Sequence, residues 1–128
     1  MATTKNNTSK GNDCLYVISY SLDGEATAER IGVFTSLIKA QACAVWQIAQ
    51  ALSVHLTGSL FIAENIATDN NEDADYYAVI NKDNGAVEYY GATDEREDVD
   101  YFAGCYARKG YNVSVKAYST EKINTVSF

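Results

Sequence analysis

The stretch YYAVINKDNGAVEYYGA, residues 76–92, decides the fold class of this chain of 128 residues. Two runs rich in β-branched and aromatic residues, 76–82 and 86–92, flank the tripeptide Asp83-Asn84-Gly85. Such runs favour strands, and Asn-Gly supplies the positive φ angles that a tight hairpin turn needs. The stretch therefore predicts an antiparallel β-hairpin.

The residues after this hairpin predict a helix and then a strand. Thr93 is a good N-cap, and Gly110 is suited to end the helix. Acidic residues, Asp94 and Glu95, occupy the first turn and basic residues the last, as the helix dipole favours. Residues 112–119 then alternate polar and apolar side chains, which is typical of a half-buried strand.

The first half of the chain shows the same order of elements. Residues 15–22 and 29–36 predict two strands, and residues 59–66 predict a third. Between the second and the third lies a predicted helix, capped by Thr35 or Ser36. Its apolar residues recur at steps of 4, 3, 4 and 3 and form one face, which we expect to pack on the sheet: Ile38, Ala42, Val45, Ala49 and Leu52.

Two one-sided helices are buried most simply against one face of a sheet. The sequence therefore predicts a single α+β domain over residues 14–128, a two-layer sandwich with a mostly antiparallel sheet, both helices on one face and the order ββαβ-ββαβ. Residues 1–13 are polar and predict a flexible tail. The second face of the sheet is then an open contact surface or dimer interface, for which the candidates are Tyr16, Ser19, Tyr77, Tyr89 and Tyr118.

No stretch of the sequence predicts catalysis, a cofactor or a metal site. The three cysteines are an odd number without C-x-x-C spacing, which favours free thiols in a reducing compartment. The single histidine, His55, has no carboxylate or nucleophile beside it in sequence, and the carboxylates between Asp69 and Asp75 lack the pattern of an EF-hand loop. Without an apolar run of about 18 residues or a signal peptide, we expect a non-enzymatic cytoplasmic protein that does not enter a membrane.

The charge of the chain is concentrated in its middle third. Residues 64–100 hold twelve acidic residues against two basic ones, whereas the rest holds five acidic and eight basic, for a net charge of −7. An acidic segment of this density repels nucleic acid and anionic membranes and attracts basic protein surfaces. Direct binding of DNA or RNA is therefore disfavoured.

The candidate binding residues lie in this acidic segment. Asp94 and Glu95 are explained by the helix dipole alone, but the next carboxylates lie where that stabilisation fades. If the loop before the hairpin folds back near the helix start, the two sets of carboxylates form one negative surface, with neighbouring tyrosines as contact anchors. The predicted site is Glu72, Asp73, Asp75, Tyr76, Glu97, Asp98, Asp100 and Tyr101.

The stretch ERIGVFTSLIKAQA, residues 29–42, resembles small phage and mobile-element proteins, in which a hairpin strand with a GVF-T/S step runs directly into a helix. With its size, its acidity and its lack of proline, the chain also resembles phage-encoded inhibitors of bacterial defence, such as anti-CRISPR and anti-restriction proteins. That class shares no sequence signature, so the resemblance implies the cytoplasm of a bacterial host and an inhibitory role but assigns no residue.

We therefore expect a protein-binding inhibitor of a nucleic-acid-processing defence enzyme, a CRISPR effector or a restriction system, whose acidic surface occupies a basic substrate channel. One alternative is a homo-oligomeric assembly module, for instance a homodimer formed through the tyrosine face. Another is a domain that sequesters a small ligand or nucleotide, with a pocket gathered from Arg30, Lys39, Arg108, Lys109 and Lys116.

Overall fold

The computed structural model describes residues 13–128, which form two compact units. Unit 1 comprises residues 13–14 and 65–120, and unit 2 comprises residues 15–64 and 121–128. The elements in chain order are β1 (Cys14–Leu22), β2 (Glu29–Phe34), α2 (Leu37–Ser53), β3 (Gly58–Thr68), η1 (Asn71–Asp73), β4 (Tyr76–Asn81), β5 (Val87–Ala92), η2 (Thr93–Glu95), α3 (Arg96–Arg108) and β6 (Val113–Ser127). Except for Asp13, the predicted tail over residues 1–13 lies outside the described residues, and the single domain over residues 14–128 stays a prediction.

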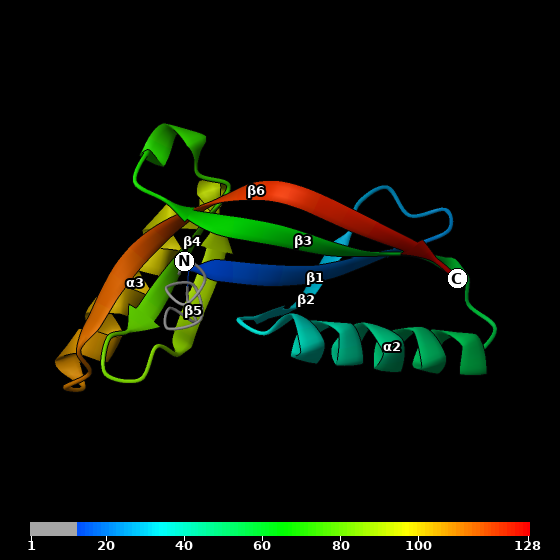
Figure 1. The fold of residues 1–128 in the computed structure, drawn as a ribbon, viewed down its shortest axis with the longest axis horizontal. Coiled ribbons are helices and arrows are strands. Elements are labelled where there is room, and N and C mark those ends of the chain that lie inside the picture. The colour runs from blue at the N-terminus through cyan, green and yellow to red at the C-terminus, as the bar shows by residue number, and fades with distance from the viewer. Residues whose placement is uncertain (1–12) are drawn as a thin grey trace, which may run out of the picture. The chain divides into compact units, whose positions relative to one another are not determined.

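The class is α+β, as predicted from the sequence. Six strands form one hydrogen-bonded sheet in the order β2-β1-β3-β6-β4-β5, and the pairs β1–β2, β4–β5 and β4–β6 are antiparallel (Figure 1). β3 and β6 contribute residues to both units.

The hairpin of β4 and β5 forms as predicted, with Tyr76 opposite Ala92. Its turn differs in detail from the expected two-residue turn, because Gly85 has a positive φ of 75° and Asn84 does not. The Asn84 side chain instead accepts a hydrogen bond from the backbone N–H of Ala86 at 2.9 Å. An Asx-type contact therefore replaces the second left-handed residue.

Unit 1 is built by packing α3 on β4 and β5. Val99 of α3 and Tyr77, Val79 and Ala117 of the sheet form a buried cluster. The absence of a side chain at Gly91 permits this approach, because a Cβ there would lie 3.1 Å from a methyl of Val99.

The start of α3 corrects one local prediction. Thr93 is not the N-cap, since its hydroxyl donates a hydrogen bond to the carbonyl of Ala74 at 2.7 Å. Glu95 instead accepts a hydrogen bond from the N–H of Ala92 at 2.7 Å and holds the chain at the entry to the helix. The other end is as predicted, with Gly110 at a φ of 96° just after the last turn.

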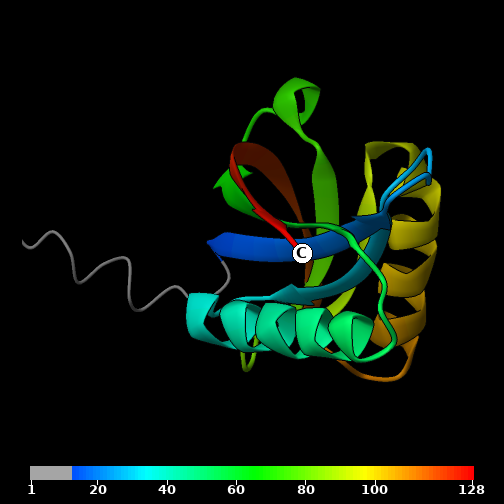
Figure 2. The ribbon, with the colours of Figure 1, turned by 90° about the vertical axis from the view of Figure 1, so that its right-hand side faces the viewer.

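Unit 2 is built by packing α2 on the β1–β2 hairpin and β3, and Figures 1 and 2 both show α2 lying alongside these strands. Ser36 caps α2 as predicted, accepting a hydrogen bond from the N–H of Lys39 at 3.3 Å. The buried cluster comprises Ile18, Ala40, Ala44, Leu60 and Ile62.

The predicted buried face of α2 is wrong. Ile38, Val45 and Leu52 are 77%, 68% and 51% exposed, whereas Ala40 and Ala44 are buried. The small alanines let the helix backbone come close to the sheet, and the larger side chains are then left on the opposite side. Periodicity identified an apolar stripe on α2, but the face that packs on the sheet is the one with the small residues Ala40 and Ala44.

The predicted open tyrosine face is also wrong in part. Tyr77 and Tyr118 are buried in unit 1. Tyr89 is half-buried, and its ring stacks on Phe102 with centroids 4.4 Å apart. Tyr16 is half-buried in unit 2, where it packs against the buried cluster of that unit.

His55 ends α2 in the left-handed region, with a φ of 61°. A side chain there is strained, and glycine relieves this strain although it gains more freedom in the unfolded chain. We expect His55→Gly to stabilise the protein by about 0.5–1 kcal/mol and to raise the melting temperature by a few degrees, measured by circular dichroism. His55→Ala is the control and should leave the melting temperature nearly unchanged, whereas a lower melting temperature for His55→Gly would contradict the strain.

Candidate functional site

The loop before β4 and the start of α3 lie at the same end of the β4–β5 hairpin in unit 1. The N–H of Thr93 donates a hydrogen bond to the carbonyl of Asp75 at 3.0 Å, and the Thr93 hydroxyl donates to the carbonyl of Ala74 at 2.7 Å. The end of η1 and the start of η2 are therefore adjacent in unit 1. We call the carboxylates around this point the acidic corner: Glu72, Asp73, Asp75, Glu97, Asp98 and Asp100.

Three carboxylates of the acidic corner are engaged within unit 1. Asp73 accepts a hydrogen bond from the Asn70 amide at 2.9 Å, and Asp75 accepts one from the N–H of Thr120 at 2.7 Å. Asp100 receives the Nε–H of Arg96 on both oxygens, at 3.0 and 3.1 Å. Asp75 is the most constrained, because its own N–H also donates to the carbonyl of Tyr118 at 2.7 Å.

The side chains of Glu72, Glu97 and Asp98 are all exposed. Glu97 and Asp98 lie in the first turn of α3, because the helix begins at Arg96. The prediction that dipole stabilisation fades at these two residues is therefore wrong, and the helix dipole favours their negative charge. The N–H of Glu72 is bonded to the Asn70 side chain at 3.0 Å. The backbone that carries these three side chains is therefore held in regular structure, which lowers the entropy cost of presenting them to a partner.

Arg96, the cation at the start of α3, is held locally. Its guanidinium lies 4.3 Å above the ring of Tyr77, besides its contacts with Asp100. The hydrogen bond with Asp100 raises the pKa of Arg96, while partial burial lowers it. Arg96 therefore offsets the charge of Asp100 and leaves that of Glu97 and Asp98 to face outward.

The two predicted tyrosine anchors differ in exposure. Tyr101 is 63% exposed, as predicted, and its ring meets Phe102 edge-on at 5.3 Å. Tyr76 is half-buried in β4, between Ala92 and Tyr118 in the sheet register. Tyr101 is thus the better contact residue of the two.

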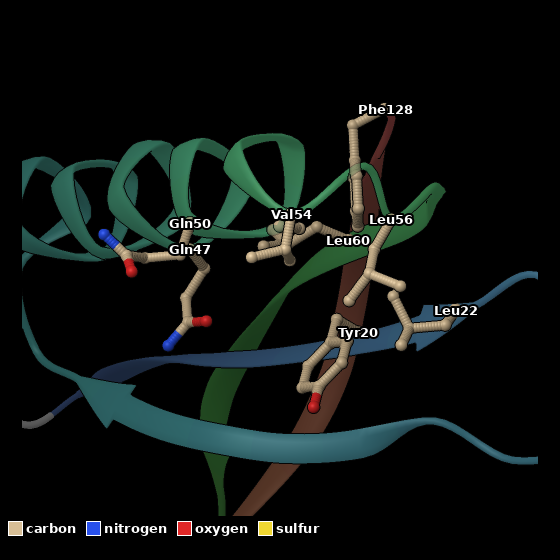
Figure 3. Close-up of a pocket in the computed structure, with 9 residues that line it drawn as sticks. Tyr20, Leu22, Gln47, Gln50, Val54, Leu56, Leu60 and Phe128 are labelled. Atoms are coloured by element: carbon tan, nitrogen blue, oxygen red, sulfur yellow. The ribbon is translucent and has the colours of Figure 1, made fainter.

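Unit 2 contains a pocket of about 310 Å³ that the sequence did not predict (Figure 3). Figure 3 shows the amides of Gln47 and Gln50 on α2 and the apolar side chains of Leu22, Leu56 and Phe128 around it. Its lining combines carboxamides with apolar groups and includes no cation, so it suits a small neutral molecule better than a phosphate. The lining residues are scattered over the chain, so no sequence signal marked the pocket.

The basic residues considered for a nucleotide pocket are divided between the units. Arg30 and Lys39 belong to unit 2, and the other three belong to unit 1. Within unit 1, Lys116 forms an ion pair with Asp13 at 3.1 Å, and Lys109 lies 5.8 Å above the ring of Tyr106. These local contacts give no support to a phosphate-binding cluster.

Among residues 13–128, no three histidine, cysteine or carboxylate side chains are grouped in a way that would hold a metal ion. Cys14, Cys43 and Cys105 form no disulfide, and burial raises the pKa of Cys43. Over the same residues, neither α2 nor α3 has the length and apolar character required to cross a membrane.

Comparison with protein-family models, with curated proteins and with solved structures gave no match for this chain.

Proposed function

We propose that this chain is a non-enzymatic binding protein that docks its acidic corner on the basic surface of a nucleic-acid-processing enzyme. The observation that carries the proposal is the pair of hydrogen bonds from Thr93 to residues 74 and 75, because they hold two acidic segments at one point of unit 1. The resemblance to phage inhibitors favours a defence enzyme, a CRISPR effector or a restriction system, in the cytoplasm of a bacterial host.

The physical basis is that carboxylates on a firm backbone substitute for phosphates. A channel that binds nucleic acid presents lysine and arginine at a spacing set by the phosphate backbone, and it accepts other anions presented in the same way. Glu72, Glu97 and Asp98 supply the outward charge, and Tyr101 supplies contact area beside it. Long-range attraction of this kind speeds association and weakens as salt is added.

The test is affinity capture from a bacterial lysate cleared of nucleic acid, at low and high salt, followed by identification and titration of the retained protein. We expect Glu97→Gln with Asp98→Asn to weaken binding roughly tenfold at low salt, since each rim charge contributes modestly to the encounter. The matched control is Glu29→Gln with Glu121→Gln, which removes the same charge from exposed positions of unit 2. An equal loss for both pairs, or binding that does not respond to salt, would reject the acidic corner as the docking site.

We also infer that the order ββαβ is repeated in the two halves of the chain. Each half runs strand, strand, helix, strand, and each helix packs on the hairpin before it. The placement of both helices on one face of a two-layer sandwich is part of the same proposal.

A further inference from the structure

The outward face of α2 is apolar over its whole length. We call its five residues the outer seam: Ile38, Ala42, Val45, Ala49 and Leu52. All five are exposed, and so is Trp46 beside them. Figure 1 shows α2 along one side of β1 and β2, with its other side directed away from these strands of unit 2. The helix therefore has buried alanines on one side and large exposed apolar groups on the other. The second side does not pack against unit 2.

The spacing of the outer seam is that of helix-to-helix packing. Steps of 4, 3, 4 and 3 average 3.5 residues, which is the repeat that keeps one stripe facing a partner helix along its length. The residues that pack on the sheet, Ala40 and Ala44, lie outside this repeat. The helix therefore carries two separate packing surfaces, and the sheet occupies one of them.

The order of side-chain sizes along the outer seam is the same from either end of α2. Read from either end of α2, the order is large, small, large, small, large, with Val45 in the middle. Two copies related by a twofold axis through Val45 would be antiparallel. Val45 would meet Val45 of the other copy, Ile38 would meet Leu52, and Ala42 would lie within about one residue of Ala49. Large groups then fill the seam while alanines let the two helices approach within about 8 Å.

We propose that the outer seam binds a second copy of this chain in this antiparallel arrangement. A twofold interface requires a surface that is complementary to itself, and the outer seam meets this requirement in the order of its large and small side chains.

The charge of α2 favours the same occupant. Among the 17 residues of the helix, Lys39 alone is charged, in a chain whose net charge is −7. Two copies that meet through α2 place no carboxylate of this helix in the contact, so the paired helices add no repulsion between carboxylates. A basic or nucleic-acid partner finds no complementary charge on this helix.

The contact extends beyond the seam. A groove of about 440 Å³ runs beside α2 and is lined by Leu37, Val45, Ile48, Ile62 and Val126, among others. A helix of this length spans about 25 Å, so the seam, Trp46 and this groove form an exposed apolar surface along the helix, and contiguous surfaces of this kind mark interaction sites.

Disulfide trapping tests the register. In a background with Cys14, Cys43 and Cys105 replaced by serine, Val45→Cys is expected to form covalent dimers within minutes of adding diamide, which accepts the two electrons and two protons of the paired thiols. Ile38→Cys and Leu52→Cys should each remain monomeric alone and cross-link when mixed. The matched control, Gln50→Cys, is exposed but off the seam and should not cross-link. Self-cross-linking of Ile38→Cys would overturn the antiparallel register, and failure of Val45→Cys would overturn the interface.

Light scattering on the native sequence provides a second readout. We expect a concentration-dependent dimer that Val45→Glu shifts to monomer, at least tenfold in dissociation constant, with an unchanged circular dichroism spectrum. Ile123→Glu, at another exposed apolar position, on β6, should leave the dimer intact. A monomer at all concentrations, or equal loss with both variants, would overturn the proposal. Neutralising Glu97 and Asp98 should not affect dimerisation, so this result is independent of the acidic corner.

Discussion

Gly58→Ala is expected to destabilise the protein by about 3 kcal/mol, at the upper end of the cost of overpacking, because the added methyl group meets backbone rather than side chain. A Cβ at Gly58 would lie 2.3 Å from the carbonyl oxygen of Ser21 and 2.8 Å from the Cα of Leu22. Gly58 is also buried and exchanges two backbone hydrogen bonds of 2.9 Å with Phe128. Strand β3 therefore has to shift against β1, and a loss of this size is a large part of the stability of a small protein.

The measurement is urea unfolding followed by circular dichroism, with hydrogen exchange to locate the loss in α2 and the first residues of β3. The matched control is Gly104→Ala in α3, where the new Cβ would lie 3.4 Å from the flexible end of Arg108. The same chemical change should there stabilise the protein by about 0.5–1 kcal/mol, because glycine is a poor helix former. If the two substitutions had effects of the same sign, the close approach at Gly58 would be refuted.

The second large effect is expected at alkaline pH and arises from Tyr118. Its side chain is fully buried in β6, and this burial raises the pKa of its hydroxyl well above the ordinary value of about 10, with a further increase from Asp13 and Cys14. The unfolded chain therefore loses this proton first. The stabilisation is complete below pH 10 and is lost as the pH rises from 10 toward the raised pKa, by at most about 1.4 kcal/mol per pH unit.

Other tyrosines and the lysines also titrate in this range, so the informative quantity is a difference. Unfolding free energies of the native chain and of Tyr118→Phe should run parallel from pH 7 to 9.5. Above pH 10 the native chain should lose stability faster, and the phenylalanine variant should become relatively more stable. Tyr111→Phe, at an exposed position, is the control and should follow the native curve. Parallel curves for Tyr118→Phe up to pH 11.5 would disprove the shift.

The local elements could be predicted from the sequence because their causes are local. The Asn84-Gly85 turn, the Ser36 cap and Gly110 at the end of α3 each depend on residues within a few positions. Thr93 shows where this reasoning ends, since its hydroxyl bonds to a carbonyl 19 positions earlier. A few neighbouring residues are enough to predict a hairpin turn. They do not predict a hydrogen-bond partner that is distant in sequence.

The prediction of the buried face of α2 failed for a different reason. Periodicity correctly found a stripe of apolar residues, but it could not say whether the sheet or another surface covers that stripe. The alanines at positions 40 and 44 carried the relevant signal, since small residues four apart mark a close approach. A prediction of the buried face that relies on the large apolar residues therefore selects the outer seam.

The candidate site was predicted in composition and only partly in role. The exposure of Glu97 and Asp98 follows from the spacing around Val99, but their place in the first turn was not predicted, because the expected cap was Thr93 and the observed cap is Glu95. The role of Asp75 was not predictable, because its partner Thr120 lies 45 residues away on another strand. The pocket of unit 2 was missed for the same reason, since its walls come from four separate segments.

The position of Asp75 has a consequence for any alanine or amide scan of the acidic corner. The backbone of Asp75 bonds to Thr93 and Tyr118, and its carboxylate accepts a hydrogen bond from the N–H of Thr120, so Asp75→Ala removes one hydrogen bond of this joint as well as a charge. A drop in affinity for Asp75→Ala would therefore reflect the lost hydrogen bond as well as the lost charge. Variants at Glu72, Glu97 or Asp98 leave the hydrogen bonds of Asp75 in place. Only these variants therefore report the electrostatic contribution of a carboxylate to the binding of the partner.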